Sequence, residues 1–275
     1  IGVSHIGNLG SQENICKAKL EICAGLPEGA PLVLNGDDPF LRKAVLPDHV
    51  RPVWFSLGDE NADVCALSIQ QDEKGMSFVL EDHEEGTFLV KIPAMGRHNV
   101  ANALAAYCAA TRLGCDPRGV IKGLAEFEQT GRRQKVVHSK GVTVIEDCYN
   151  AGPESTEAAL DILAGFRARA KGRCIAVLGD MLELGSFSEQ AHREVGEKAA
   201  QNGIDAVLTY GERALLTAEG AKAGGVPLVR SFSDKKELSD FLLSELHEGD
   251  AVLFKASRGM KLEDVIYSVY SAIEE

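Results

Sequence analysis

The chain of 275 residues is 45% hydrophobic and 25% charged, which is typical of a soluble globular protein with one large domain or two medium ones. A formal net charge of −12 with scattered Lys and Arg argues against a nucleic-acid-binding surface. No apolar run reaches transmembrane length and no signal-peptide pattern is found, so we expect a cytoplasmic protein with no membrane or nucleic-acid partner.

The first half of the chain is predicted to mix helices with short strands. Ser11 is expected to cap a helix that runs to about residue 24 and buries one apolar stripe, made of Ile15, Ala18 and Ile22. Strands are expected at residues 31–35 and 51–57. Alternating segments between residues 62 and 92 indicate an antiparallel β meander, which resembles an insertion.

A glycine-led helix is predicted from about residue 97 to residue 113. Asn99 and Asn102 lie three positions apart and so share a face near its start, where two side-chain amides could read the edge of a nucleotide base. The alternative is that Asn99 only caps the helix. A second helix is expected to begin at Pro117, with Asp116 as its cap.

Beyond a polar link at residues 130–134, strands and helices alternate regularly. We place the domain boundary at this link, which divides the chain into domains 1–134 and 135–275. Five strands are predicted in the second domain, at residues 142–147, 173–178, 204–210, 226–231 and 251–255. The predicted fold class is α/β: a central domain with an antiparallel insertion, followed by a doubly wound, mostly parallel, Rossmann-like domain.

Charged loops follow three of these strands. Their polar residues are Asp147 after the first strand, Asp180 and Glu183 after the second, and Ser257 and Arg258 after the last. Ligands of open parallel sheets collect at the carboxyl ends of the strands, and two acidic loops beside a basic one would suit a zwitterion. The alternative for Asp147 is a capping role in the helix that begins at Pro153.

The seven cysteines include no C-x-x-C pair and no Cys/His cluster at zinc spacing. We interpret them as reduced thiols, mostly small buried apolar residues. Cys148 lies in a candidate loop and could be reactive, but the sequence suggests no partner His, which favours burial.

Six motifs occur in the order found in the Mur ligases, and the resemblance covers essentially the whole chain. They are Gly2-Val-Ser-His5 with the segment 10–22, Gly96-Arg-His98-Asn99-Val-x-Asn102, Gly131-Arg132, Asp147-Cys-Tyr149-Asn150, Leu178-Gly-Asp180-Met-x-Glu183, and Lys255-x-Ser257-Arg258. The chain most resembles the branch that adds a dipeptide. It departs from the family at Gly152, where Asn is usual, and at Ala256, where Gly is usual.

The resemblance implies an ATP- and Mg²⁺-dependent ligase that joins D-alanyl-D-alanine to UDP-N-acetylmuramoyl-tripeptide through an acyl phosphate, in peptidoglycan precursor synthesis. It is expected to act as a monomer. The roles implied are Mg²⁺ binding for His5 and for a carbamate on Lys19, adenine contact for Asn99 and Asn102, phosphate contact for Arg132, and ribose contact for Asp147, flanked by Tyr149 and Asn150. Asp180 and Glu183 would face the dipeptide ammonium, and Ser257 and Arg258 its carboxylate. Without the resemblance, His5 and Lys19 would be interpreted as a packed loop histidine and a solvated lysine.

The family's G-x-x-x-x-G-K-[ST] phosphate loop has no match in the sequence. We therefore expect the chain to be the C-terminal portion of a longer enzyme, and to be inactive alone. Two alternatives stay open: another Mur-type or folylpolyglutamate-type ligase, and a non-catalytic binding module of the same fold.

Overall fold

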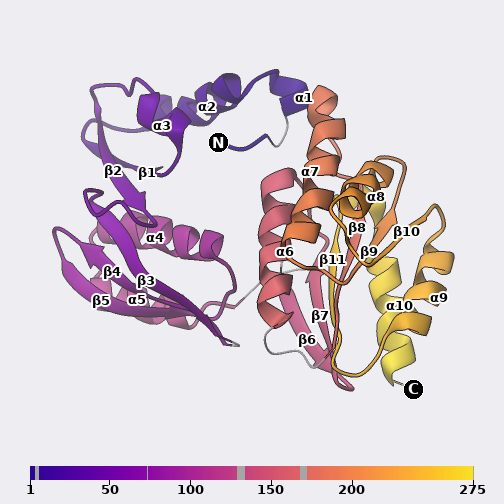
Figure 1. The fold of residues 1–275 in the computed structure, drawn as a ribbon. Coiled ribbons are helices and arrows are strands. Elements are labelled where there is room, and N and C mark those ends of the chain that lie inside the picture. The colour runs from indigo at the N-terminus through magenta and orange to yellow at the C-terminus, as the bar shows by residue number, and fades with distance from the viewer. Residues whose placement is uncertain (4–5, 73, 129–133, 168–171, 275) are drawn as a thin grey trace. The chain divides into compact units, whose positions relative to one another are not determined.

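The computed structural model describes residues 1–3, 6–72, 74–128, 134–167 and 172–274. They form two compact units (Figure 1). Unit 1 comprises Ile1–Gly2 and Leu9–Glu128, and unit 2 comprises Val3–Asn8 and Gln129–Glu275. The short helix α1 (Ile6–Leu9) ends where unit 1 resumes. The domain boundary expected at residue 134 stays a prediction.

Unit 1 is built on a five-stranded sheet in the order β1-β2-β3-β4-β5. The strands are β1 (Ala30–Asn35), β2 (Val50–Ser56), β3 (Val64–Asp72), β4 (Gly75–Asp82) and β5 (Gly86–Ile92). β1, β2 and β3 run parallel, whereas β3, β4 and β5 are antiparallel. The predicted meander is therefore confirmed. Gly75 begins β4 at a φ of +143°, where a Cβ would lie 2.0 Å from the Ile92 carbonyl oxygen, so this approach to β5 requires glycine.

The helices of unit 1 are α2 (Gln12–Leu20) with the 3₁₀ turn η1 (Glu21–Gly25), α3 (Pro39–Lys43), α4 (Arg97–Thr111) and α5 (Pro117–Ala125). Two of them, α4 and α5, pack against this sheet. Val100, Leu104 and Tyr107 of α4 have no solvent exposure and pack in one cluster with residues of β4 and β5. Asp116 caps α5 as predicted, because its carboxylate accepts a hydrogen bond from the Gly119 amide.

One predicted stripe is wrong at its end. Ser11 caps α2 as expected, accepting from the Asn14 amide. The α-helix ends at Leu20, however, and the tighter 3₁₀ turn that follows rotates the chain. Ile22 is therefore 62% exposed, and Cys23, which is 3% exposed, takes its place in the core.

Unit 2 contains a six-stranded sheet in the order β10-β9-β8-β11-β7-β6. The strands are β6 (Lys135–Ser139), β7 (Val142–Asp147), β8 (Cys174–Gly179), β9 (Ala206–Tyr210), β10 (Leu228–Phe232) and β11 (Ala251–Lys255). All neighbours are parallel except β6, which pairs antiparallel with β7. The five predicted strands and the parallel arrangement are confirmed, whereas β6 was not predicted.

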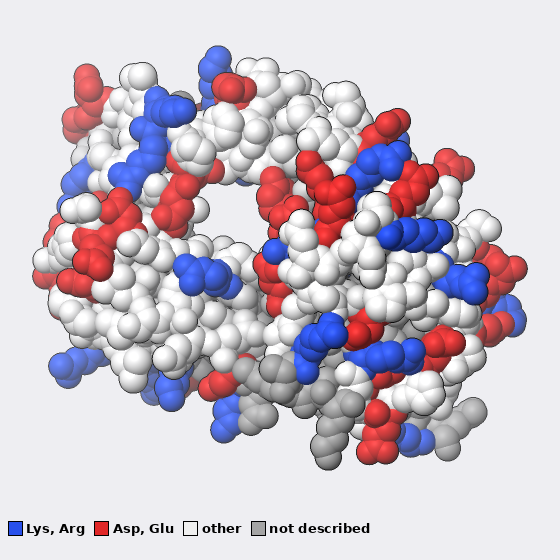
Figure 2. All heavy atoms as spheres, viewed as in Figure 1, with Lys and Arg blue, Asp and Glu red and all other residues white. Residues whose placement is uncertain are grey.

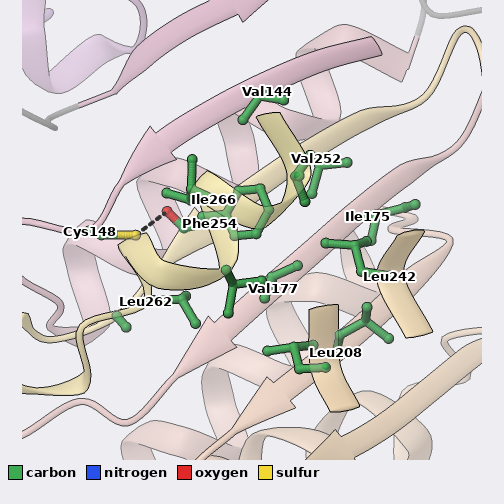
Figure 3. Packing of buried hydrophobic residues seen from close by; sticks show 14 of the residues in the cluster. Val144, Cys148, Ile175, Val177, Leu208, Leu242, Val252, Phe254, Leu262 and Ile266 are labelled. Carbon is green, nitrogen blue, oxygen red and sulfur yellow. Dashed lines mark hydrogen bonds between the residues drawn. The ribbon is translucent and has the colours of Figure 1, made fainter. Parts of the chain in front are cut away.

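Helices cover both faces of this sheet, as a doubly wound fold requires (Figure 1). They are α6 (Pro153–Arg167), α7 (Ser188–Gln201), α8 (Ala214–Ala223), α9 (Lys235–Glu245) and α10 (Glu263–Glu274), with 3₁₀ turns η2 (Gly185–Phe187) and η3 (Arg258–Met260). Figure 3 shows the core on one face, where Val177 and Phe254 of the sheet meet Leu242 of α9 and Ile266 of α10. This apolar packing holds the strand ends at fixed positions.

The surface gives two further observations. Acidic and basic side chains are interspersed on the face shown in Figure 2, without a continuous basic stripe on its described residues. Among the described residues, every helix is too short or too polar to span a bilayer.

Candidate functional site

The carboxyl edge of the unit 2 sheet brings the three predicted loops together. β7, β11 and β8 are neighbours in that order, so the loops that follow Asp147, Lys255 and Gly179 leave the sheet side by side. The Lys255 ammonium donates to Asp147 Oδ2 over 2.7 Å and to the Asn150 carbonyl oxygen over 3.0 Å. Both ionic side chains are buried. This pair therefore joins β11 to the loop that follows β7.

Ser257 links all three loops from a buried position. Its hydroxyl accepts from the Leu182 amide over 2.9 Å and donates to the Ala151 carbonyl oxygen over 3.4 Å. Its own amide donates to the Asp180 carbonyl oxygen over 3.1 Å. The predicted ligand residue Ser257 thus makes loop-to-loop bonds in this structure.

Asp180 is also buried and acts on a neighbouring element. Its Oδ1 accepts from the Ala214 amide at the start of α8 over 2.7 Å. Gly211 lies directly against this carboxylate, since a Cβ there would meet Asp180 Oδ1 at 2.3 Å. Asp180 also lines a cavity of about 500 Å³, together with Tyr210, Phe232 and Met260. The Asp180 carboxylate therefore caps the start of α8 and also lines the cavity at the edge of the sheet.

Four of the predicted site residues at this edge are exposed: Tyr149, Asn150, Glu183 and Arg258. The Arg258 guanidinium lies over the Tyr149 ring, 5.6 Å from its centroid, a cation–π contact that restricts both side chains. Glu183 has a left-handed φ of +66°, and its carbonyl oxygen accepts from the Gly7 amide. One acidic and one basic side chain are thus presented to solvent on two braced loops.

Cys148 is buried, as favoured, and its thiol donates to the Phe254 carbonyl oxygen over 3.4 Å (Figure 3). Burial raises the pKa of this thiol to about 12, and the neighbouring Asp147 carboxylate adds to the effect. A thiol of this kind stays protonated at neutral pH and is a poor nucleophile. Cys148 is therefore a core residue rather than a catalytic one.

The predicted nucleotide residues of unit 1 lie at the start of α4. Asn99 Nδ2 donates to the Met95 carbonyl oxygen over 2.7 Å, and Asn102 Nδ2 donates to Asn99 Oδ1 over 3.2 Å. Gly96 occupies the N-cap position, so Asn99 is not the cap. The two amides are thereby linked on one face of α4, with Asn102 exposed.

The predicted magnesium ligands are only partly described. Lys19 is exposed on the last turn of α2, whereas His5 lies outside the described residues, as does the predicted phosphate contact Arg132. The described part of the chain contains no cluster of three or more His, Cys, Asp or Glu side chains placed to hold a metal ion. The assignment of Lys19 and His5 to Mg²⁺ therefore stays a prediction that rests on the resemblance.

Sequence reasoning missed His192, a residue of α7 with no solvent exposure. Its Nε2 accepts from the Met181 amide over 3.0 Å, and its Nδ1 donates to the Ser188 carbonyl oxygen over 2.6 Å. Burial lowers the pKa of this imidazole, although the Ser188 carbonyl oxygen and Asp180 act in the opposite direction. The available signal was a lone His on the apolar face of the helix that follows an acidic loop.

Comparison with known proteins gives two family matches. The Mur ligase middle domain matches residues 1–110, and the Mur ligase glutamate ligase domain matches residues 131–258. The UDP-N-acetylmuramoyl-tripeptide–D-alanyl-D-alanine ligase of Bacillus subtilis is 38% identical over 97% of this chain and 57% of its own length. The protein of the same name from Escherichia coli is 34% identical over 97% of this chain and 58% of its own length. The chain thus spans somewhat more than half of these relatives.

Solved structures of Mur ligases also resemble this chain. A crystal structure of MurF from Acinetobacter baumannii aligns with a TM-score of 0.87 at 28% identity, covering 100% of this chain and 58% of that one. MurF from Thermotoga maritima in complex with ADP aligns with a TM-score of 0.83 at 28% identity, covering 100% of this chain and 61% of that one.

Proposed function

The chain belongs to the Mur ligase family, and from this premise we propose that it carries nucleotide-binding and amine-binding residues of an ATP-dependent amide ligase. The proposed reaction joins D-alanyl-D-alanine to UDP-N-acetylmuramoyl-tripeptide in peptidoglycan precursor synthesis. The names of the Bacillus subtilis and Escherichia coli relatives support this choice of substrates. The ADP complex of the Thermotoga maritima neighbour supports ATP as the energy source.

The proposed chemistry has two steps. The tripeptide carboxylate attacks the γ-phosphorus of ATP, so that ADP leaves and an acyl phosphate forms. The amine of D-alanyl-D-alanine then attacks the acyl carbon, the C–O bond to phosphate breaks, and the amine loses a proton as the amide forms. Activation is needed because a carboxylate resists nucleophiles.

The observation that carries the amine site is the pair of opposite charges, Glu183 and Arg258, exposed on loops that buried polar groups hold together. A zwitterionic dipeptide needs one acid for its ammonium and one base for its carboxylate, and a guanidinium can bind a carboxylate through two parallel hydrogen bonds. We assign these contacts to Glu183 and Arg258. Asp180 and Ser257, which are buried, contribute chiefly by fixing the loops, and Asp180 also faces the adjoining cavity.

Roles in nucleotide binding are also proposed, residue by residue. Asn99 and Asn102 of unit 1 are assigned to adenine because their linked amides offer donors and acceptors on one helix face. Asp147, with Tyr149 and Asn150, is assigned to the ribose side, and Arg132 to the phosphates. Lys19, as a carbamate, and His5 would hold Mg²⁺, which would offset the negative charge of the phosphates.

A hybrid protein tests the proposal, with residues 1–275 replacing the matching part of the Bacillus subtilis relative. We expect phosphate release that requires ATP, the UDP-linked tripeptide and D-alanyl-D-alanine, with neither D-alanine nor glutamate replacing the dipeptide. Release with glutamate alone would favour another branch of the family. No release with any amine would favour the binding-module alternative.

The Arg258→Gln exchange in the same hybrid tests the assigned contact. Losing one charge-assisted contact should raise KM for the dipeptide about tenfold and leave KM for ATP unchanged. The matched control is Arg230→Gln, because Arg230 is an exposed arginine on β10. An unchanged dipeptide KM in the Arg258 variant would remove Arg258 from the site.

A further inference from the structure

A closed set of hydrogen bonds surrounds His192 and joins three elements of unit 2. The Met181 amide, on the loop after β8, donates to His192 Nε2, and His192 Nδ1 donates to the Ser188 carbonyl oxygen at the start of α7. The Arg213 guanidinium, just before α8, donates to Ser188 Oγ over 3.4 Å. The Ala214 amide completes the set by donating to Asp180 Oδ1.

The bonds to His192 define one state of the imidazole. A carbonyl oxygen can only accept, so Nδ1 carries the proton, and Nε2 must then be the unprotonated acceptor for the Met181 amide. Protonation of Nε2 would set two N–H groups against each other. The bond to Met181 therefore exists only with the neutral ring.

The loop that this bond holds is the acidic loop of the proposed amine site. Hydrogen bonds hold the backbone of three consecutive residues in this loop. Ser257 bonds to the Asp180 carbonyl oxygen and to the Leu182 amide, and His192 bonds to the Met181 amide between them. Met181 itself is 2% exposed and packs inside unit 2. Glu183 follows directly, so its position depends on these bonds.

We propose that His192 is a positioning residue, which sets the acidic loop for the incoming amine through its hydrogen bond to the Met181 amide. The inference rests on the proposed function for its effect on catalysis, but the bond itself can be measured without activity. His192 does not touch the ligand. It acts through the loop that carries Asp180 and Glu183.

The charged groups that face His192 are Asp180, on the loop after β8, and Arg213, before α8. Asp180 favours the imidazolium and Arg213 disfavours it, whereas burial, the largest effect, favours the neutral ring and lowers the pKa of His192 below its ordinary 6.5. The loop should therefore be held throughout the neutral range and released in acid, once the imidazole is protonated.

The first experiment uses the 275-residue chain and nuclear magnetic resonance of its imidazole nitrogens and amides. We expect a single Nδ1–H tautomer of His192 at neutral pH and slow hydrogen exchange at the Met181 amide. His192→Phe fills the space without an acceptor and should speed that exchange at least tenfold. His192→Gln retains an acceptor oxygen and should keep most of the protection.

The second experiment measures the dipeptide KM of the hybrid protein. His192→Phe should raise it about tenfold with KM for ATP unchanged, and His192→Gln should restore it while removing its rise in acid. The control is His247→Gln, since His247 is exposed and precedes β11 at the opposite edge of the sheet.

The outcomes separate the proposals. A charged His192 at neutral pH, or Met181 exchange unaffected by His192→Phe, would overturn the hydrogen bond. Faster Met181 exchange with an unchanged dipeptide KM would overturn the positioning role. A wild-type hybrid without activity would count against the proposed function. In that case, the dissociation constant for the dipeptide is measured by titrating the 275-residue chain and following its amide signals. Equal dissociation constants for wild type and His192→Phe would then overturn the positioning role.

Discussion

At the residue scale, the polar side chains of unit 2 divide into those that brace the loops and those that face solvent. Sequence patterns placed Asp147, Asp180 and Ser257 at the correct edge of the sheet, since a strand followed by a polar loop is visible in the sequence. They could not show that each side chain is buried. Burial depends on partners such as Lys255 and Ala214, which lie 108 and 34 residues away and come near only through the strand order.

The Lys255–Asp147 pair yields a stability prediction. Asp147→Asn removes one charge and leaves the Lys255 ammonium buried without its counter-ion, which should lower the free energy of unfolding by about 3–5 kcal/mol. Adding Lys255→Met to Asp147→Asn should recover much of this loss. Urea unfolding followed by the amide signals of unit 2 measures both effects.

The matched control is Lys236→Met, which breaks the pair with Asp240. Both of its side chains are largely exposed, so no measurable change is expected. Equal effects of Asp147→Asn and Lys236→Met would show that the interior pair contributes no more than a surface pair.

At the scale of elements, periodicity and capping predicted most helices and strands because these signals are local. Asp116 and Pro117 marked the start of α5, and alternating residues marked the meander. Two local features were missed. β6 is a short strand that is stabilised by pairing with β7. Ile22 lies outside the core because it belongs to the 3₁₀ turn η1 and not to the α-helix α2.

The contact between β4 and α4 gives a pH prediction for unit 1. Arg112, at the end of α4, binds both carboxylate oxygens of Asp82 at 2.8 and 2.9 Å. Burial, the largest single effect, would raise the pKa of Asp82, but the hydrogen bonds and positive charge of Arg112, together with the Glu84 amide, outweigh it and hold that pKa below the ordinary 3.8. A depressed carboxyl pKa contributes stability above the unfolded value, and this contribution is lost as pH falls through the folded value.

Unit 1 should therefore lose stability as the pH falls below about 4, and Asp82→Asn should flatten this dependence while lowering stability at pH 7. Urea midpoints reported by Trp54, the sole tryptophan and a residue of unit 1, give the measurement. Asp59→Asn serves as a control because Asp59 pairs with Arg42 at the surface. If the urea midpoint of Asp82→Asn falls in acid as steeply as that of the wild type, the loss of stability is due to other carboxyl groups.

At the scale of the whole molecule, the resemblance of six short motifs to the Mur ligases is confirmed by the family matches to both halves of the chain. Composition could not have shown this, since many soluble α/β proteins share it. The motifs were informative because they combine glycines, amides and charges in a fixed order over the whole length, a pattern that folding alone does not require.

The last prediction concerns nucleotide binding by the 275 residues on their own. A phosphate loop supplies backbone N–H groups and a lysine for the β- and γ-phosphates, and this sequence contains no such motif. The proposed contacts of Asn99, Asn102 and Asp147 address only the base and the ribose. Arg132 is the one residue of the chain assigned directly to the phosphates. We therefore expect weak ADP binding by calorimetry and no dipeptide-dependent phosphate release from the chain alone. The hybrid protein, assayed in parallel, should bind ADP at least a hundredfold more tightly. Charge-assisted hydrogen bonds from a phosphate loop would contribute a few kcal/mol to binding, which corresponds to about a hundredfold in Kd. Equal ADP affinities of the chain and the hybrid, or robust turnover by the isolated chain, would mean that the 275 residues contain phosphate-binding groups that we have not assigned.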